Sequence, residues 1–74
     1  MPKPLSSINK DSSVVVKYCA DVPLKKRLLS LGILPKQVFM VKNRLSNGAV
    51  VLGNDDFKIA IDAFSAQQIL VQVV

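Results

Sequence analysis

The sequence predicts a mainly β domain, a small five-stranded barrel with one short α-helix after the first strand. Three observations carry this prediction: the chain has only 74 residues, apolar residues alternate over several short segments, and one segment has helical spacing instead. A chain of this length holds a single hydrophobic core. Short strands joined by tight turns favour a strongly bent barrel over a sandwich.

Residues 1–13 are polar and contain two prolines, which predicts a loosely ordered N-terminal lead-in to the barrel. Leu5 and Ile8 are the only side chains of this segment that we expect to anchor it. The barrel domain itself is expected to span residues 14–74.

The first strand is predicted at residues 14–19, which are rich in β-branched side chains. Side chains alternate along a strand, so Val14, Val16 and Tyr18 are expected on one face. Cys19 then belongs to the opposite face. It is the only cysteine of the chain, and we expect a small packing residue or an inert thiol.

Segment 21–32 changes from alternation to helical spacing, because three leucines recur at i, i+4 and i+7. The leucines expected to face the barrel core are Leu24, Leu28 and Leu31. Asp21 supplies negative charge and a cap at the helix start, and Pro23 suits the first turn. Gly32 is expected just after the helix, where a left-handed backbone costs a glycine little.

The remaining strands are predicted at residues 37–43, 49–52, 57–61 and 69–73. Asn47 and Gly48 mark the turn between the first two of these, since both residue types tolerate positive φ. Phe57 belongs to the cleanest alternating segment and is expected to point inward. Ser65 and Gln68 fit a capping box in which Ser65 is the N-cap of a single helical turn.

The formal charge is +5, from ten Lys and Arg against five acidic residues. This balance permits nucleic acid, anionic lipid or an acidic protein as a partner. The chain has no His and one Cys, so we expect no metal site, no cofactor and no enzyme chemistry. Asp55 and Asp56 are expected to be solvated turn residues. No signal peptide or membrane-spanning segment is recognisable, which favours a cytoplasmic protein.

Residues 24–35 read Leu-Lys-Lys-Arg-Leu-Leu-Ser-Leu-Gly-Ile-Leu-Pro. This stretch resembles the helix and turn of the FeoA family (ferrous iron transport protein A), whose pattern is Leu-basic-basic-Arg-Leu-Leu-x-Leu/Met-Gly-Leu/Ile-x-Pro. Segments 57–61 and 66–71 are similar to later parts of that pattern, so the resemblance spans nearly the whole chain. It implies an SH3-like β-barrel that works beside FeoB, the membrane-bound ferrous iron transporter of bacteria.

The resemblance implies a non-enzymatic accessory protein that binds the cytosolic domain of a FeoB-type transporter and supports or regulates iron uptake. It would then lie at the inner face of the membrane through that partner. The candidate partner-binding residues are Lys25, Lys26, Arg27, Leu45, Ser46, Asn47 and Gly48. The first three form a basic run on the helix, which is also typical of a merely solvated face. The oligomeric state stays open, a homo-oligomer included.

Two other functions remain as alternatives. SH3-like barrels also serve as RNA- or ribosome-binding modules, and a basic chain fits that role. Against it, a reader of single strands needs exposed aromatic side chains, and Phe57 is expected to face inward. The barrel is also similar to the C-terminal domain of metal-dependent repressors, but no helix-turn-helix precedes it here, so DNA binding is not expected.

Overall fold

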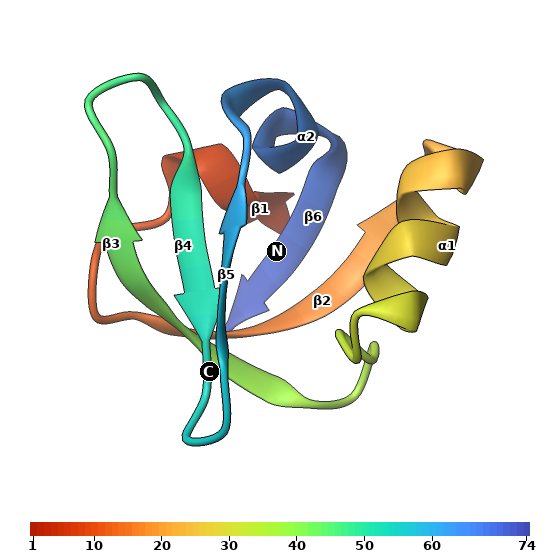
Figure 1. The fold of residues 1–74 in the computed structure, drawn as a ribbon, viewed down its shortest axis with the longest axis horizontal. Coiled ribbons are helices and arrows are strands. Elements are labelled where there is room, and N and C mark those ends of the chain that lie inside the picture. The colour runs from red at the N-terminus through yellow and green to blue at the C-terminus, as the bar shows by residue number, and fades with distance from the viewer.

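Six strands form one antiparallel sheet in the computed structural model, which describes residues 1–74 (Figure 1). In sheet order they are β1 (Lys3–Pro4), β6 (Ile69–Val73), β2 (Ser13–Cys19), β3 (Val38–Arg44), β4 (Val50–Gly53) and β5 (Lys58–Ile61). The α-helices are α1 (Val22–Ser30) and α2 (Ala63–Gln68), and a 3₁₀ turn, η1, covers Leu5–Ser7. The edge strands β1 and β5 are not paired with each other, so the sheet coils without closing.

The mainly β class is confirmed, but three details of the expected barrel are wrong. The sheet has six strands rather than five, it is open, and the single helical turn expected at residues 65–68 is part of a longer α-helix, α2. The additional strand, β1, pairs Lys3 with Val71 and Pro4 with Leu70, so α1 follows the second strand. Two residues are too few to show an alternating pattern, which is why the sequence did not reveal this strand.

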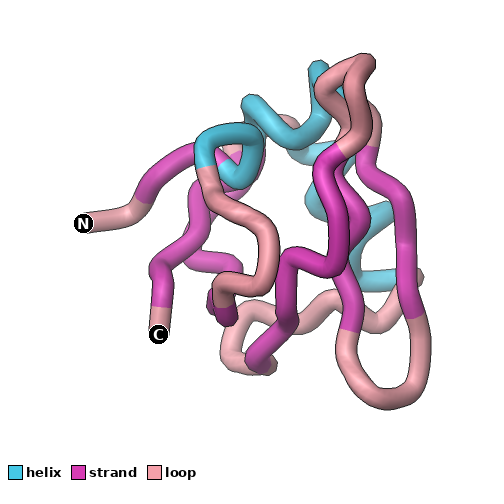
Figure 2. The backbone as a smooth tube through the Cα atoms, turned by 90° about the vertical axis from the view of Figure 1, so that its left-hand side faces the viewer, coloured by secondary structure: helices cyan, strands magenta, loops and turns pink.

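The N-terminal segment is held to the body by the two expected anchors. Leu5 is fully buried and Ile8 is 3% exposed, and both belong to the core cluster. Leu5 lies in η1, which packs against α2. Because β1 pairs with β6, the two chain ends lie on one side of the molecule (Figure 2).

A β-bulge changes the faces of β2. Its pairing with β6 shifts register between Val16 and Tyr18, so Lys17 is the additional residue. Val14 and Val16 face the core as expected, whereas Tyr18 is 60% exposed and Cys19 is buried. The predictions that Tyr18 shares a face with the valines and that Cys19 lies on the opposite face are therefore wrong, because strict alternation fails at a bulge.

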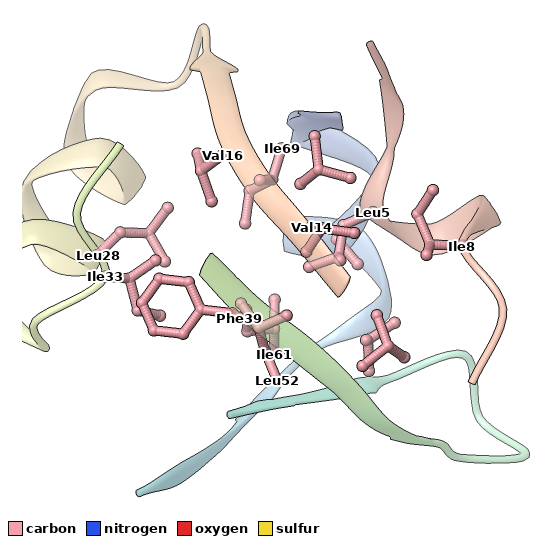
Figure 3. Close-up of a cluster of buried hydrophobic side chains, with 14 of the residues drawn as sticks. Leu5, Ile8, Val14, Val16, Leu28, Ile33, Phe39, Leu52, Ile61 and Ile69 are labelled. Atoms are coloured by element: carbon pink, nitrogen blue, oxygen red, sulfur yellow. The ribbon is translucent and has the colours of Figure 1, made fainter. Parts of the chain in front are cut away.

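The core fills the space between the two halves of the coiled sheet (Figure 3). Its largest fully buried side chains are Phe39, Leu5, Leu52, Ile69, Val14, Val41, Val50 and Val71. Phe57 packs against this cluster and meets Phe39 edge to face, with ring centroids 6.0 Å apart. The inward orientation expected for Phe57 is confirmed.

The helix α1 ends in a Schellman motif that decides which of its leucines are buried. The amide of Gly32 donates to Leu29 O (3.1 Å) and that of Ile33 donates to Leu28 O (2.9 Å), with Gly32 at φ +88°. Leu28 and Ile33 both enter the core (Figure 3). Leu31 is 41% exposed, so its predicted core position is wrong: the chain reverses at Gly32 and Ile33 returns to the core instead.

The second helix also begins earlier than expected. Asp62, not Ser65, is the N-cap of α2, and its carboxylate accepts a hydrogen bond from the Ser65 amide (3.1 Å). Ser65 is consequently the third residue of the helix. Asp62 lies three residues before Ser65, and both residue types favour the N-cap position. In this structure Asp62 occupies that position.

Candidate partner-binding surface

The basic run lies on α1, whose start is fixed by the predicted cap. The Asp21 carboxylate accepts a hydrogen bond from the Leu24 amide (3.1 Å). Successive helix residues point about 100° apart, so Lys25, Lys26 and Arg27 spread around the outer side of the helix. All three are exposed. The structure thus presents these predicted residues to solvent, in three different directions.

Arg27 lies on the side of α1 that is next to the sheet. It lines a shallow groove between α1 and β5, the α1–β5 groove, together with Leu24, Leu31, Ile59 and Asp62. The Ser65 hydroxyl and amide lower the pKa of the Asp62 carboxyl, and the nearby Arg27 charge adds to this effect. Arg27 therefore lies near a carboxylate of its own chain while staying exposed.

The other predicted segment, residues 45–48, forms the tip of the β3–β4 connection. Across it, the Leu45 amide donates a hydrogen bond to the Ala49 carbonyl oxygen (2.8 Å), and the Gly48 amide donates to the Leu45 carbonyl oxygen (3.0 Å). The Asn47 side chain accepts from the Ala49 amide (3.0 Å). Gly48 has φ +92°, as the turn prediction allowed, whereas Asn47 does not have a positive φ. All four predicted residues, Leu45 to Gly48, are exposed.

The structure does not bring the two predicted segments together. In Figure 1 the helix α1 lies at the right and the β3–β4 connection at the upper left. The start of α2 lies between them, since Asp62 lines the α1–β5 groove with Arg27, and a Cβ atom at Gly48 would lie 2.9 Å from that of Ala63. Lys25 borders a different hollow on the far side of α1. A partner that uses both segments must therefore extend across α2.

That hollow, the β2–α1 hollow, was not predicted from the sequence. It has a volume of about 110 Å³ and lies between the end of β2, α1 and the turn that follows α1. Its apolar lining includes Val16, Tyr18, Cys19, Leu28, Leu29 and Ile33, and the exposed Lys17 and Lys25 border it. Tyr18 lines the hollow because the bulge turns it outward, and no sequence pattern signals that bulge.

No group of three or more potential metal-ligating side chains occurs in the structure. Cys19 is buried, and its thiol donates to the carbonyl oxygen of Asp21 (3.6 Å). Its expected role as a small packing residue is confirmed, since it belongs to the core cluster. Asp55 and Asp56 are exposed, and the turn that holds them is organised by the Asn54 side chain. None of the helices has the length and hydropathy needed to cross a bilayer.

Comparison with known proteins decides the family. A family model described as FeoA domain matches residues 3–73, nearly the whole chain. The chain belongs to the FeoA family. This family is associated with ferrous iron uptake and consists of small accessory domains with an SH3-like β fold, and it is not known as an enzyme family. The match begins at Lys3 and so includes β1 and η1.

Two solved structures show the same fold as this FeoA chain. One is a crystal structure of an iron uptake regulatory protein (FeoA), with a TM-score of 0.83, 20% identity, and coverage of 100% of this chain and 99% of that one. The other is the NMR structure of an FeoA-like protein from Clostridium acetobutylicum, with a TM-score of 0.83, 17% identity, and coverage of 99% and 87%. No curated protein matches this chain.

Proposed function

We propose that this FeoA chain is a non-enzymatic cytoplasmic protein that binds the cytosolic domain of a FeoB-type ferrous iron transporter and supports or regulates uptake. The observation that carries the proposal is the FeoA match over residues 3–73, because it ties the whole fold to ferrous iron uptake. The protein would reach the inner face of the membrane through this partner.

The surface chemistry supports an acidic protein partner. The chain carries a charge of +5, and Lys25 and Lys26 are exposed on α1. Exposed charges of this kind steer association with a surface of opposite sign. The second predicted segment, residues 45–48, is separated from them by α2 and offers Leu45 as a half-exposed apolar contact.

Affinity capture from the native membrane fraction tests this function. The tagged protein is used as bait, and co-eluting proteins and RNA are identified by mass spectrometry and sequencing. We expect recovery of the FeoB-type permease, reduced when the bait carries Lys25→Glu and Lys26→Glu. Recovery of ribosomal proteins or RNA without the permease would contradict the proposal and favour the RNA-binding alternative.

A further inference from the structure

We propose that the β2–α1 hollow is the anchoring pocket for the partner, and that it takes one apolar side chain carried on an acidic segment. This inference rests on the proposed function, because it names the part of the surface that holds the transporter's cytosolic domain. It differs from the sequence-based expectation, which placed contact on the basic run and on residues 45–48.

The size and lining of the hollow fit a single apolar side chain. Its volume is about 110 Å³, and most of its lining residues are hydrophobic. An apolar protein cavity of about 150 Å³ is large enough to bind benzene. The hollow is smaller than that cavity, so an aliphatic side chain is the kind of group that it accommodates.

Exposed apolar side chains continue the hollow onto the surface. Tyr18 is 60% exposed and Leu29 is 43% exposed, and both line the hollow. Leu34, in the turn between Ile33 and Pro35 of its lining, is 49% exposed. A cluster of this kind beside a concave site is typical of a protein-binding surface. The β-bulge at Lys17 adds Tyr18 to this cluster, since strict alternation would turn Tyr18 into the core.

The charges at the border of the hollow determine which occupant is favoured. Lys17 and Lys25 are both exposed, and no acidic residue lines the hollow. The nearest carboxylate in sequence, that of Asp21, is engaged with the Leu24 amide. Carboxylates beside the apolar anchor would pair with the two lysines. A second copy of this chain is disfavoured as the occupant, because each copy carries a charge of +5.

Two matched pairs of variants of the intact protein test the pocket. Leu29→Gln changes the hollow, whereas Leu31→Gln changes a residue of similar exposure just after the end of the same helix, which lines the α1–β5 groove. Tyr18→Ser also changes the hollow, and Phe64→Ser is its control, since Phe64 is 67% exposed on α2. All four side chains are at least 41% exposed, so the fold is expected to persist in each variant.

The affinity for the purified cytosolic domain of the FeoB-type transporter is measured by calorimetry. Amide shifts of the ¹⁵N-labelled protein are followed in parallel. We expect Leu29→Gln and Tyr18→Ser to weaken binding about tenfold or more, and the two controls to change it less than about twofold. The largest shifts are expected at residues 16–19 and 28–35.

The outcomes separate this inference from the proposed function. If the wild-type protein binds the domain but only the Leu31 or Phe64 variant weakens binding, the pocket assignment is wrong and the function stands. If the wild-type protein does not bind the domain at all, the proposed function fails, and the pocket assignment with it. If the domain shifts amides of residues 45–48 and 62–66 alone, the anchor lies at α2 instead.

Discussion

A Cβ atom placed on Gly48 would lie 2.9 Å from the Cβ atom of Ala63. The tip of the β3–β4 connection therefore rests directly on the first turn of α2. This contact joins two segments that are distant in sequence, and it needs a residue without a side chain at position 48. Gly48 also has φ +92°, so its backbone conformation and its packing both favour glycine at this position.

Replacing Gly48 by Ala should lower the free energy of unfolding more than replacing Gly32 by Ala. Gly32 has φ +88° but open space around it, so Gly32→Ala should cost about 1–2 kcal/mol from backbone strain alone. Gly48→Ala adds a steric clash, which typically costs a further 1–3 kcal/mol or so. Urea denaturation of both variants measures the difference.

The clash itself can be tested by a double-mutant cycle. Adding Ala63→Gly to Gly48→Ala removes the atom that the new methyl group meets. The two changes should then show a favourable coupling of about 1 kcal/mol or more. Additive effects of the two substitutions would mean that the loop does not rest on α2.

Leu28→Ala should destabilise the protein by about 2–5 kcal/mol, the usual cost of truncating a buried leucine. Leu28 is 5% exposed and packs in the core with Ile33. Leu31→Ala is the control, since Leu31 is 41% exposed, and it should cost under about 1 kcal/mol. Thermal unfolding by circular dichroism compares them. Similar melting temperatures for the two variants would contradict the orientation of α1.

The sequence predicted where the strands and helices of this fold lie better than it predicted which of their side chains face the core. The strands and α1 were found by their periodicity or composition, and the caps Asp21 and Gly32 by their chemistry. The helical turn at residues 65–68 was found from its capping residues, although Asp62 is the cap. The errors at Tyr18 and Leu31 have one cause, because each follows a local break in periodicity, a bulge in one case and a helix end in the other. Periodicity cannot be extended across such breaks.

Acid should destabilise the wild-type protein partly through Asp62. Its folded-state pKa lies below the ordinary value of 3.8, chiefly because of the hydrogen bonds from Ser65. As pH falls, the unfolded chain therefore takes up a proton at this carboxyl before the folded protein does. The stabilisation is complete above the ordinary pKa of 3.8 and is lost as pH falls through the lower pKa of the folded state. Asp62→Asn keeps a capping side chain but removes this titration.

Urea midpoints measured from about pH 5 to about pH 2 check this expectation. The Asp62→Asn variant should lose less stability over this range than the wild type. Asp55→Asn serves as the control, because Asp55 is an exposed turn residue. An equal loss in the wild type and in Asp62→Asn would show that Asp62 contributes nothing to acid sensitivity.

Ferrous iron should bind the isolated monomer no more tightly than ordinary surface carboxylates do. Tight sites bring several nitrogen, oxygen or sulfur ligands together, and the chain has no histidine and a single buried cysteine, Cys19. Anaerobic calorimetry measures this directly. A one-to-one site of low micromolar affinity would contradict the expectation, and its loss in Cys19→Ser would assign it to the thiol.

The candidate surface was less predictable from the sequence than the fold. Lys25 and Lys26 could be placed outside by helix geometry, and both are exposed. The β2–α1 hollow could not be found, because it combines residues from a strand, a helix and a turn that come together only in the folded chain. Its key residue, Tyr18, is exposed through a bulge that leaves no compositional signal.

The rate of association with the transporter's cytosolic domain tests the central claim most directly. Stopped-flow mixing compares the wild type with the variant that carries Lys25→Glu and Lys26→Glu, and with an equally charged control that carries Lys3→Glu and Lys10→Glu. We expect the first variant to associate about tenfold more slowly at low salt, with the difference shrinking at high salt. The control should slow association much less. Equal rates for the two variants, or no association by the wild-type protein, would contradict the account.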